Sequence, residues 1–552
     1  MSLAVEKEFV FTFSSKDQKS TLKVPVTIPL QQSASDLVGR LVAAHNLPCY
    51  VEDDLKKSLE KFVDDETWKF HDENAEAAIA KVRKDPSLVD GLVDKWSGVF
   101  KKEVKKFADN EAVSEEEKFA DVYHTLIHSP ALETLLNLEH EYACTIEDLI
   151  DQRDRDLQHL ENSQRKEMET AVQNVGVMYT DDQINQLAQR HFENTQLIDS
   201  KWSGELSNVK ESQKKEYREW VMTVHQAMQT TDRVPAYLQR VRALSLTMPE
   251  AKEGERSSQS TTMEESFTIH LGAQMKTTHN LRLLCTDVLD LCRHKPHTVG
   301  GVLVPQPQRL QTAMSLYSSN LSGLILLVDN RLNYYTGLKR DFAKVCEMST
   351  DFHFPAMDQQ FAHIEKEVVI ANEFRVHSRS TEDGDSTSIK SGGSGSSDGQ
   401  DKANRIQTGD FYMTKHSNLA EVHVLFHLVC DDSIRFSDMT SRHPVILSIR
   451  NIIKLCFRYD ITTITIPLLL AHDMSEEMTI PWCMKRAELI FKCVKGFVME
   501  MSTYSAQESR TIQFLVPRGM SEEMFASISA MLPSIFRLSN SIVVKSSSPN
   551  SA

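Results

Sequence analysis

The sequence lacks any apolar run that approaches the ~20 residues a membrane-spanning helix requires. Its first residues, MSLAVEKE, contain no apolar core of the kind found in signal peptides. These two absences exclude an integral membrane protein and a secreted one. We therefore predict a cytoplasmic protein with no direct membrane insertion.

Positive charge is also scarce. The 62 lysines and arginines are outnumbered by 78 aspartates and glutamates, which gives a formal net charge of −16. A chain that binds nucleic acid through its overall charge needs the opposite balance. The one basic run, 101–106, contains Glu103 and lies near acidic clusters, which favours a solvated helix face. We expect partners that are proteins, with any RNA bound by another molecule.

Metal-ligand spacings are missing as well. The nine cysteines are odd in number and include no Cys-x-x-Cys pair, which is typical of buried thiols in a reducing compartment. On the helix expected over 281–292, Cys285 and Cys292 would lie ~10 Å apart along the axis. On a strand, His423 and His427 would lie ~13 Å apart. We therefore predict no metal and no cofactor.

Strand and helix patterns alternate in the C-terminal part of the chain. Residues 422–430, 461–470 and 511–516 are apolar and β-branched, and amphipathic helical patterns follow at 444–459, 481–501 and 521–532. Upstream, strands are expected at 267–271 and 323–330, and helices at 281–292 and 336–347. This order predicts a mostly parallel sheet with helices on both faces. Such sheets bind ligands beyond the carboxyl ends of their strands.

The N-terminal half follows another pattern. Alternating stretches at 8–13 and 21–28 predict a β-hairpin, and the chain from Leu37 to about Met228 is helical with breaks near prolines. The predicted fold class is therefore α+β and multidomain, with a helix-rich N-terminal half and a C-terminal three-layer α/β domain. The expected divisions are 1–130 (hairpin and helices), 131–246 (long coiled-coil-like helices), 247–264 (linker) and 265–546 (sheet domain), with a disordered insertion at 375–409.

An apolar stripe runs along the long helices of 131–228 in steps of three and four residues. A turn at 176–182 would allow two helices to pack on each other as a hairpin. The alternative is that the stripe forms a seam for a partner helix. For that case, the predicted docking residues are Ile184, Ile198, Trp202, Leu206 and Trp220, because aromatic anchors dominate interface energy.

The best candidate for chemistry is the loop 471–478, which follows a predicted strand. His472 and Asp473 have the residue types of a general base and its orienting group. The loop contains no glycine to bring backbone N–H groups to a phosphate, and it carries three acidic residues. The motif MSEEM recurs at 520–524, which favours helix capping by Ser475 and Ser521. We therefore predict no catalytic residue in this loop or elsewhere.

Two resemblances add to this picture, and the first concerns the sheet domain. The strings LILLVDNRLN at 324–333 and DITTITIPLL at 460–469 resemble parts of the macrodomain family. That resemblance implies a three-layer macro-like fold and, as an alternative function, a nucleotide or ADP-ribose binding or hydrolysing enzyme. The positions of the two phosphate loops hold NYYTGLKR at 333–340, with Gly337 alone, and the glycine-free loop at 471–478. No family site residue is therefore carried over.

The second resemblance covers the whole chain. The strings TTITIPLLL at 462–470, HDMSEEMTIPWC at 472–483 and KRAELIFKCVKGF at 485–497 resemble the family of the third subunit of the FERRY complex. The resemblance implies a non-catalytic adaptor subunit of a five-part complex on early endosomes, which is an effector of a Rab GTPase. It further implies a link between endosomes, mRNA and ribosomes, and a role in mast-cell degranulation. The implied partners are the other subunits, one of them a coiled-coil protein, with the Rab GTPase and mRNA reached indirectly.

Overall fold

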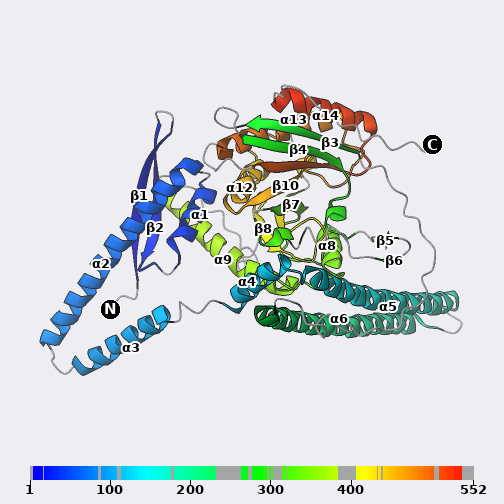
Figure 1. Ribbon diagram of the computed structural model, residues 1–552, viewed down its shortest axis with the longest axis horizontal. Helices are drawn as coiled ribbons and strands as arrows, with labels where there is room; N and C mark the ends of the chain where they lie inside the picture. The colour runs from blue at the N-terminus through cyan, green and yellow to red at the C-terminus, as the bar shows by residue number, and fades with distance from the viewer. Residues whose placement is uncertain are drawn as a thin grey trace.

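The structure is a computed structural model of the full chain. It describes residues 4–15, 18–30, 32–45, 47–84, 89–108, 114–175, 179–231, 263–271, 277–294, 298–299, 302–303, 312, 314–318, 320–382, 406–431, 433–436, 439–502 and 509–536. Three parts are visible in Figure 1: an N-terminal hairpin with its helices, a pair of long helices, and a sheet with helices on both faces.

The N-terminal part is an antiparallel hairpin packed on two helices. Strands β1 (Val5–Ser15) and β2 (Gln18–Ile28) pair along their whole length, which confirms the predicted hairpin. Helices α1 (Ala34–Ala44) and α2 (Glu52–Lys84), joined by the 3-10 turn η1 (Cys49–Val51), cover one face of it. Phe9, Val24, Leu41 and Leu55 are among the side chains buried between them. The alternation of the strands therefore places one apolar face against the helices.

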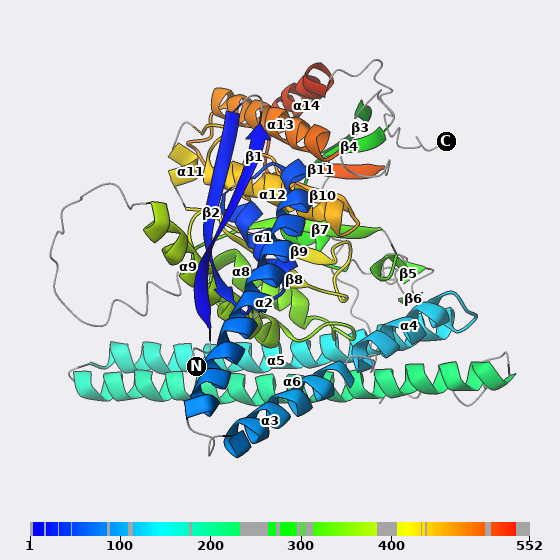
Figure 2. The ribbon, with the colours of Figure 1, turned by 90° about the vertical axis from the view of Figure 1, so that its left-hand side faces the viewer.

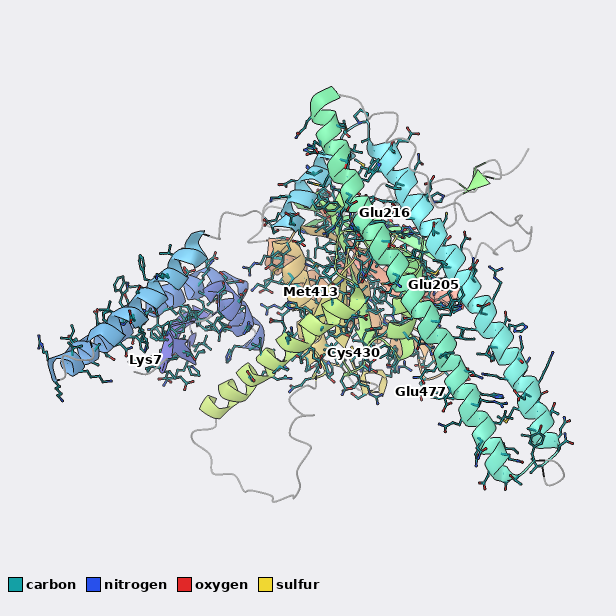
Figure 3. All side chains as sticks on the ribbon, turned by 90° about the horizontal axis from the view of Figure 1, so that it is seen from below. Lys7, Glu205, Glu216, Met413, Cys430 and Glu477 are labelled. Carbon is teal, nitrogen blue, oxygen red and sulfur yellow. The ribbon has the colours of Figure 1, made fainter. Side chains whose placement is uncertain are left out.

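Four helices follow along the chain. They are α3 (Val89–Ala108), α4 (Glu115–Ile127), α5 (Leu132–Gln173) and α6 (Asp181–Thr231). Ser114 caps α4 by accepting from the Glu117 N–H, while the Glu117 carboxylate accepts from the Ser114 N–H. Helices α5 and α6 pack side by side as a long hairpin that crosses under the sheet and extends past it (Figures 2 and 3). The apolar stripe is therefore covered within the chain.

The sheet combines parallel strands with two antiparallel edges. Its strands are β3 (Met263–Leu271), β4 (Thr277–Cys285), β7 (Leu321–Val328), β8 (Phe411–Lys415), β9 (Val424–Val429), β10 (Ile461–Pro467) and β11 (Arg510–Val516). Within the described residues the spatial order is β3-β4-β11-β10-β7-β9-β8. The neighbouring pairs among β4, β11, β10, β7 and β9 are parallel. The edge strands β3 and β8 are antiparallel to β4 and β9, and a separate short hairpin is formed by β5 (Thr298–Val299) and β6 (Val302–Leu303).

Helices cover the sheet on both faces. One face packs against α12 (Pro444–Arg458), α13 (Ile480–Ser502) and α14 (Glu522–Phe536), with Ile325, Ile449, Phe491 and Phe514 in the shared core. The other face packs against α8 (Gly337–Glu347) and α9 (Met357–Glu382). Two smaller elements, η5 (Val288–Leu291) and α11 (Ser433–Phe436), follow strands β4 and β9. This arrangement confirms the predicted α+β multidomain fold class with its three-layer sheet unit.

One predicted helix is wrong. Residues expected to form a helix over 281–292 form strand β4 and the short turn η5 instead. The apolar residues Leu281, Leu284, Cys285, Val288 and Leu289 recur at three- and four-residue steps, which is the spacing of a helix face. In the structure the strand supplies the first three of them and η5 the last two, and within β4 the buried Leu281 and Leu283 alternate with Asn280 and Arg282.

Two segment boundaries also differ from the prediction. Helix α9 continues through Glu382, and Arg375 within it pairs with Asp410, so residues 375–382 are helical instead of part of a disordered insertion. Residues 406–409 are described as well, with Ile406 buried, whereas 383–405 lie outside the described residues. Of the predicted linker 247–264, the last two residues belong to β3 and the remainder lies outside the described residues.

A shared apolar core and an ion pair join the three parts. Helix α4 shares its core with α5 and α6, where Phe119 and Tyr123 are buried beside Tyr217. Phe352, from the turn after α8, enters the same core and stacks on Tyr217 with ring centroids 4.2 Å apart. On the other side, Glu52 at the start of α2 pairs with Lys454 of α12 at 2.5 Å. The sheet unit therefore holds both N-terminal parts.

Candidate functional site

A cavity of about 440 Å³ lies at the carboxyl ends of β7, β9 and β10. The residues directly after these strands line it, together with parts of α8 and α11. Its polar lining residues are Asp329, Asn330, Thr408, Asp431, Arg435, His472 and Asp473. The loop 471–478, in which the sequence places the best candidate for chemistry, therefore contributes to a real cavity.

The sheet topology explains why the cavity forms here. After β7 the chain continues to the strands on one side of it, first β8 and then β9. After β10 it continues to β11, on the other side. Because β7 and β10 are neighbours, the two connections leave in opposite directions and open a crevice between them. This is the topological switch point at which open α/β sheets bind ligands.

The charges at this cavity are mostly negative. Asp329 pairs with the buried Lys339, and Asp431 accepts from the Ser433 N–H at 3.1 Å and from the Thr408 hydroxyl at 3.0 Å. Hydrogen bonds from Ser433 and then from Thr408 hold the pKa of Asp431 below its usual range. Asp473 adds a third carboxylate. These three carboxylates outnumber Arg435, the one basic residue in the described lining of the cavity, and they disfavour the phosphate groups of a nucleotide.

His472 is arranged as a structural residue. Its Nε2 accepts the backbone N–H of Leu327 at 2.9 Å, so the neutral ring carries its proton on Nδ1. Burial lowers the pKa of His472 to about 4, so the ring is neutral at physiological pH. The only ring lone pair that could accept a proton, on Nε2, already accepts the N–H of Leu327 in β7. His472 therefore satisfies a backbone group and is unsuited to act as a general base.

The remaining groups of the loop support the same conclusion. Burial raises the pKa of the neighbouring Cys430 thiol to about 12, which leaves it protonated and a weak nucleophile. Ser521 accepts the Met524 N–H at 3.3 Å, which confirms its capping role at α14. The same prediction for Ser475 is wrong. Helix α13 begins at Ile480, and the Thr479 carbonyl accepts the first helical hydrogen bond, from the Cys483 N–H.

The paired histidines and cysteines have separate surroundings. His423 accepts the Ser322 N–H through Nδ1, whereas His427 shares a hydrogen bond with Thr414 on the edge strand β8. Burial lowers the pKa of both rings, and that of His427 falls well below its usual value. Cys285 ends β4 and Cys292 follows η5, so the two thiols are not on a common helix. Within the described residues, no three side chains are grouped as a metal site.

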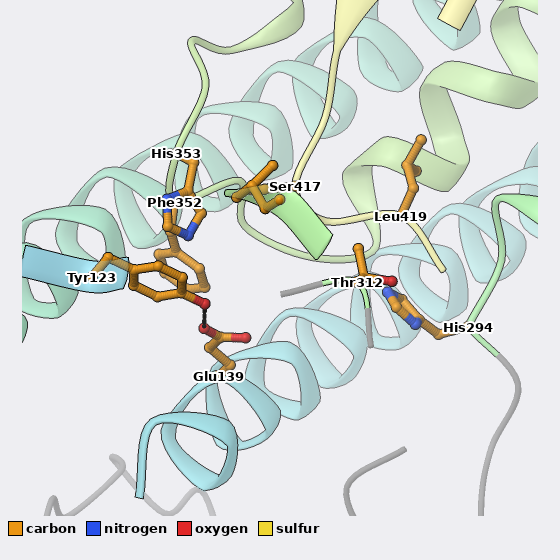
Figure 4. A pocket seen from close by; sticks show the side chains of 9 residues that line it. Tyr123, Glu139, His294, Thr312, Phe352, His353, Ser417 and Leu419 are labelled. Atoms are coloured by element: carbon orange, nitrogen blue, oxygen red, sulfur yellow. Dashed lines mark hydrogen bonds between the residues drawn. The ribbon is translucent and has the colours of Figure 1, made fainter. Parts of the chain in front are cut away.

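A second, much smaller cavity lies where the helical hairpin meets the sheet unit (Figure 4). Its volume is about 20 Å³, which is room for about one water molecule. Tyr123 of α4 and Glu139 of α5 lie on one side, and the Tyr123 hydroxyl donates to the Glu139 carboxylate at 3.4 Å. Tyr217 also donates to Glu139. Desolvation, followed by the charge of Glu139, raises the pKa of both tyrosines well above their usual value.

The opposite side of this small cavity comes from the segment after α8. Asp351 accepts from the Ser417 and Phe354 backbone N–H groups, and Lys214 of α6 donates to the Phe354 carbonyl at 2.6 Å. Gln213 accepts from the Thr350 hydroxyl at 2.6 Å. The sequence patterns did not predict this contact, although the aromatic run DFHF at 351–354, after the predicted helix over 336–347, was a visible signal. The network joins the hairpin to the sheet unit and offers no space for a substrate.

The five predicted docking residues lie on α6, within the hairpin. Trp202 is 6% exposed and packs with Leu206 against Ile146, and Ile198 adjoins that cluster. Trp220 is 8% exposed and lies in the core shared with α4. Ile184, near the turn, is half-buried. Docking through these side chains stays a prediction, and it would require the seam to open.

Comparison with known proteins places the chain in a family. The family model described as Ferry endosomal RAB5 effector complex subunit 3 matches residues 35–542. The human protein named Ferry endosomal RAB5 effector complex subunit 3 is 47% identical over 545 residues, which is 98% of each chain. The rat and mouse proteins of that name are each 46% identical, again over 98% of each chain.

Two further observations complete the comparison. No solved structure matches the chain. In the part of the chain that the structure describes, no helix combines the length and apolar character needed to cross a membrane.

Proposed function

Because this chain belongs to the family of Ferry endosomal RAB5 effector complex subunit 3, we propose that it acts as a subunit of such a complex on endosomes. The single observation that carries the proposal is the similarity to the human protein over 98% of both chains. We propose that its contribution is that of an adaptor and not of an enzyme.

Support for a non-catalytic role comes from the carboxyl edge of the sheet. His472 uses its only free lone pair on the backbone of β7, and the Cys430 thiol is held protonated. The three carboxylates are at strand ends where a phosphate would otherwise bind. In the described lining of this cavity the histidine is engaged, the thiol is protonated and no glycine-rich loop offers backbone N–H groups to an anion, which supports a scaffold role.

The finer parts of the proposal follow from the family resemblance. They are the link between endosomes, mRNA and ribosomes, a role in mast-cell degranulation, and a cytoplasmic location with recruitment to early endosomes through the complex. A net charge of −16 supports indirect contact with RNA, because counterion release from phosphates requires a basic surface. The Rab GTPase and mRNA would then be bound by other subunits, one of them a coiled-coil protein.

Affinity purification tests the assembly claim. The intact chain, tagged at one end, is isolated from cytosol, and the co-purifying proteins are identified and quantified. We expect the other subunits of the complex in stable ratios that survive moderate salt. Recovery of the chain alone, or with unrelated proteins only, would overturn the proposal.

A second candidate function rests on the cavity itself. Its place at the topological switch point favours a ligand site, and the macrodomain resemblance suggests a nucleotide or ADP-ribose. The carboxylates of Asp329, Asp431 and Asp473 oppose the phosphates of such a ligand. We therefore rank this function below the adaptor role.

Calorimetric titration of the full chain with ADP-ribose decides between the two. The adaptor proposal predicts no heat of binding at millimolar ligand, and no change when Asp473 is replaced by alanine. Saturable binding that is lost in Asp473→Ala would establish the ligand site instead. Turnover of an ADP-ribosylated substrate by the purified chain would establish the enzyme.

A further inference from the structure

Strand β1 has a long edge that no other strand of the described chain pairs with. Its sheet contains only β1 and β2, and each of the two strands is 11 residues long. Strands of globular proteins most often have about 5–6 residues, so this edge is unusually long. In Figure 1 the β-hairpin lies at the left of the molecule, apart from the seven-stranded sheet. Such an edge presents a row of backbone N–H and C=O groups to any extended chain that meets it.

The register of the β-hairpin shows which backbone groups point outward. In an antiparallel pair, residues that bond to the opposite strand alternate with residues whose N–H and C=O groups point away from it. Glu8 lies opposite Pro25, which has no N–H, so these two residues form a pair that points away. The Ser14 carbonyl accepts the Tyr50 hydroxyl at 3.3 Å, so it also points away from β2. The even-numbered residues of β1 are therefore the outward ones.

These outward groups lie open along most of the strand. They belong to Glu6, Glu8, Val10 and Thr12, which are all exposed. Within the described residues, none of the four makes a backbone hydrogen bond outside the β-hairpin. Tyr50 reaches the edge only at its end, at Ser14. A second strand could therefore pair with β1 over these four residues without displacing a contact of the chain.

Strand β2 is protected where β1 is not. Pro25 removes a donor from the outer edge of β2, and helix α9 contacts that strand. Strand β1 contains no proline, and its pairing with β2 runs from Val5 to Ser15 without a bulge. Soluble proteins usually blunt a long edge with prolines, bulges or a covering element, because a bare edge pairs with other chains. The open edge of β1 therefore indicates a surface that pairs with another chain.

The side chains along this edge define the charge of that chain. Glu6 and Glu8 lie on the face of β1 opposite to the buried Phe9, and both are exposed. Glu8 is 3.7 Å from Lys23 of β2, whereas Glu6 has no ion pair within the described residues. Opposite charges on neighbouring strands stabilise a sheet, and like charges destabilise it. A strand added beside β1 is therefore expected to carry lysine or arginine opposite these two glutamates.

A second copy of β1 is a poor match for the same edge. It would bring its own Glu6 and Glu8 to the face that already holds these two residues. Its one basic residue, Lys7, belongs to the opposite face, where it pairs with Glu66 of α2 at 3.6 Å. Pairing between two copies would therefore add acidic side chains to this face and no basic one.

We propose that β1 accepts an extended basic segment of another subunit as a third strand of the β-hairpin sheet. The inference rests on the proposed function, because it names a surface through which the chain joins its complex. Main-chain hydrogen bonds along the edge hold the segment, and Glu6 and Glu8 select its charge. Binding is therefore expected to weaken as the salt concentration rises.

Hydrogen exchange in the assembled complex tests the pairing directly. Exchange of single amides along β1 is measured by mass spectrometry with electron-transfer fragmentation, for the free full chain and for the purified complex. We expect assembly to protect the outward N–H groups of Glu6, Glu8, Val10 and Thr12. The N–H of Phe9 points toward β2 and should be protected in both samples. Unchanged exchange at the four outward amides would overturn the inference.

A matched pair of proline substitutions isolates the edge of β1. Thr12 and Thr21 lie opposite each other, both are exposed, and each directs its N–H away from the other strand. Thr12→Pro removes an outward donor from β1, and Thr21→Pro makes the same change on β2. We expect only Thr12→Pro to lower recovery of another subunit with the tagged chain, roughly tenfold or more, while both variants keep the thermal transition.

Two results with the prolines would contradict the inference. Normal recovery with Thr12→Pro would overturn it and leave the proposed function intact. An equal loss with Thr21→Pro would show that assembly needs the β-hairpin as a whole and not the edge of β1.

Charge reversal tests the kind of partner. Glu6→Lys is compared with Glu161→Lys on α5, because both glutamates are exposed. We expect only Glu6→Lys to lower recovery of the subunit, and the difference to shrink at high salt. Recovery that is unaffected by Glu6→Lys would contradict a basic segment. A dimer mass of the isolated chain in light scattering that becomes a monomer mass in Thr12→Pro would assign the edge to a second copy and overturn the proposal.

Discussion

Trp202 is one of the few large side chains that hold the helical hairpin together. It lies on α6 and packs with Leu206 against Ile146 and Leu149 of α5. The flanking positions of both helices are largely polar and exposed, so this cluster provides much of the apolar contact in its part of the hairpin. The hairpin therefore depends on few large residues, as expected for long helices with a thin stripe.

We predict that Trp202→Ala destabilises the hairpin. Removing a buried tryptophan leaves a cavity and typically costs about 3 kcal/mol or more. Denaturant unfolding followed by circular dichroism should show a lower midpoint, and Phe192→Ala, an exposed position on the same helix, should leave it within experimental error. If Trp202→Ala keeps the midpoint but loses the partner subunits, the tryptophan is a docking anchor.

Buried histidines give the stability a defined pH dependence. Burial lowers the pKa of His416 to about 3 and, with the charge of Arg510, lowers that of His279 to about 4. The unfolded rings titrate near ~6.5. Below that pH the unfolded state binds protons that the folded state does not, so stability is present above ~6.5 and is lost as the pH falls toward the folded pKa values.

We expect the free energy of unfolding to fall by about 2.5 kcal/mol from these two rings between pH 7 and pH 5.5. Urea titrations at both pH values measure this change. His416→Gln should remove about half of it, whereas the exposed His363→Gln on α9 should not alter it. A pH slope that is unchanged by His416→Gln would show that the ring is charged in the folded protein.

Individual residues also mark the limit of prediction from sequence. Ligands of open α/β sheets bind beyond the carboxyl ends of the strands, and this rule correctly located the loop of His472 and Asp473 beside a cavity. The acceptor role of His472 depends on Leu327, which is 145 positions away, and no local pattern reveals it. Ser475 and Ser521 lie in the same motif, yet only Ser521 caps a helix, because the first of these helices begins several residues later.

At the scale of elements, amphipathic helices and buried strands were predicted well, and the exception is a run whose apolar spacing imitates a helix. The helices over 444–459 and 336–347 have one apolar face each, and they appear as α12 and α8. The run at 281–292 has apolar residues at helical spacing although it forms a strand and a turn, and its strand pairing with β11 involves residues more than two hundred positions apart.

The order of the strands leads to a prediction about folding units. Strand β7 lies between β9 and β10, so a fragment of residues 416–546 contains β9 and β10 without the strand that joins them. We expect this fragment to lack cooperative unfolding, because β9 loses both of its neighbours, β7 and β8, and β10 keeps only β11. Residues 265–546, with 383–405 replaced by a short flexible linker, should unfold in one transition.

Calorimetry of the two fragments tests whether residues 265–546 form one folding unit. A sharp transition in residues 416–546 alone would contradict the proposed domain of 265–546. The shorter deletion is necessary because Arg375, on α9, pairs with Asp410. Deleting residues from 375 onward should therefore lower the midpoint of the longer fragment.

The whole molecule is organised around the sheet unit. It binds the N-terminal part through Glu52 and Lys454, and the helical hairpin through Phe352 and its neighbours. Both N-terminal parts extend beyond the sheet in different directions (Figures 1 and 2). Such a shape presents separate helical surfaces from one rigid centre, which suits a subunit that joins other proteins.

We propose that this chain reaches a Rab GTPase only as part of its complex. The most direct test immobilises Rab5 loaded with a non-hydrolysable GTP analogue and passes over it either the purified chain or the purified complex. We predict that the chain alone is not retained, and that it is retained together with the other subunits. Retention of the chain alone at the same level, or absence of the chain from a retained complex, would contradict the account.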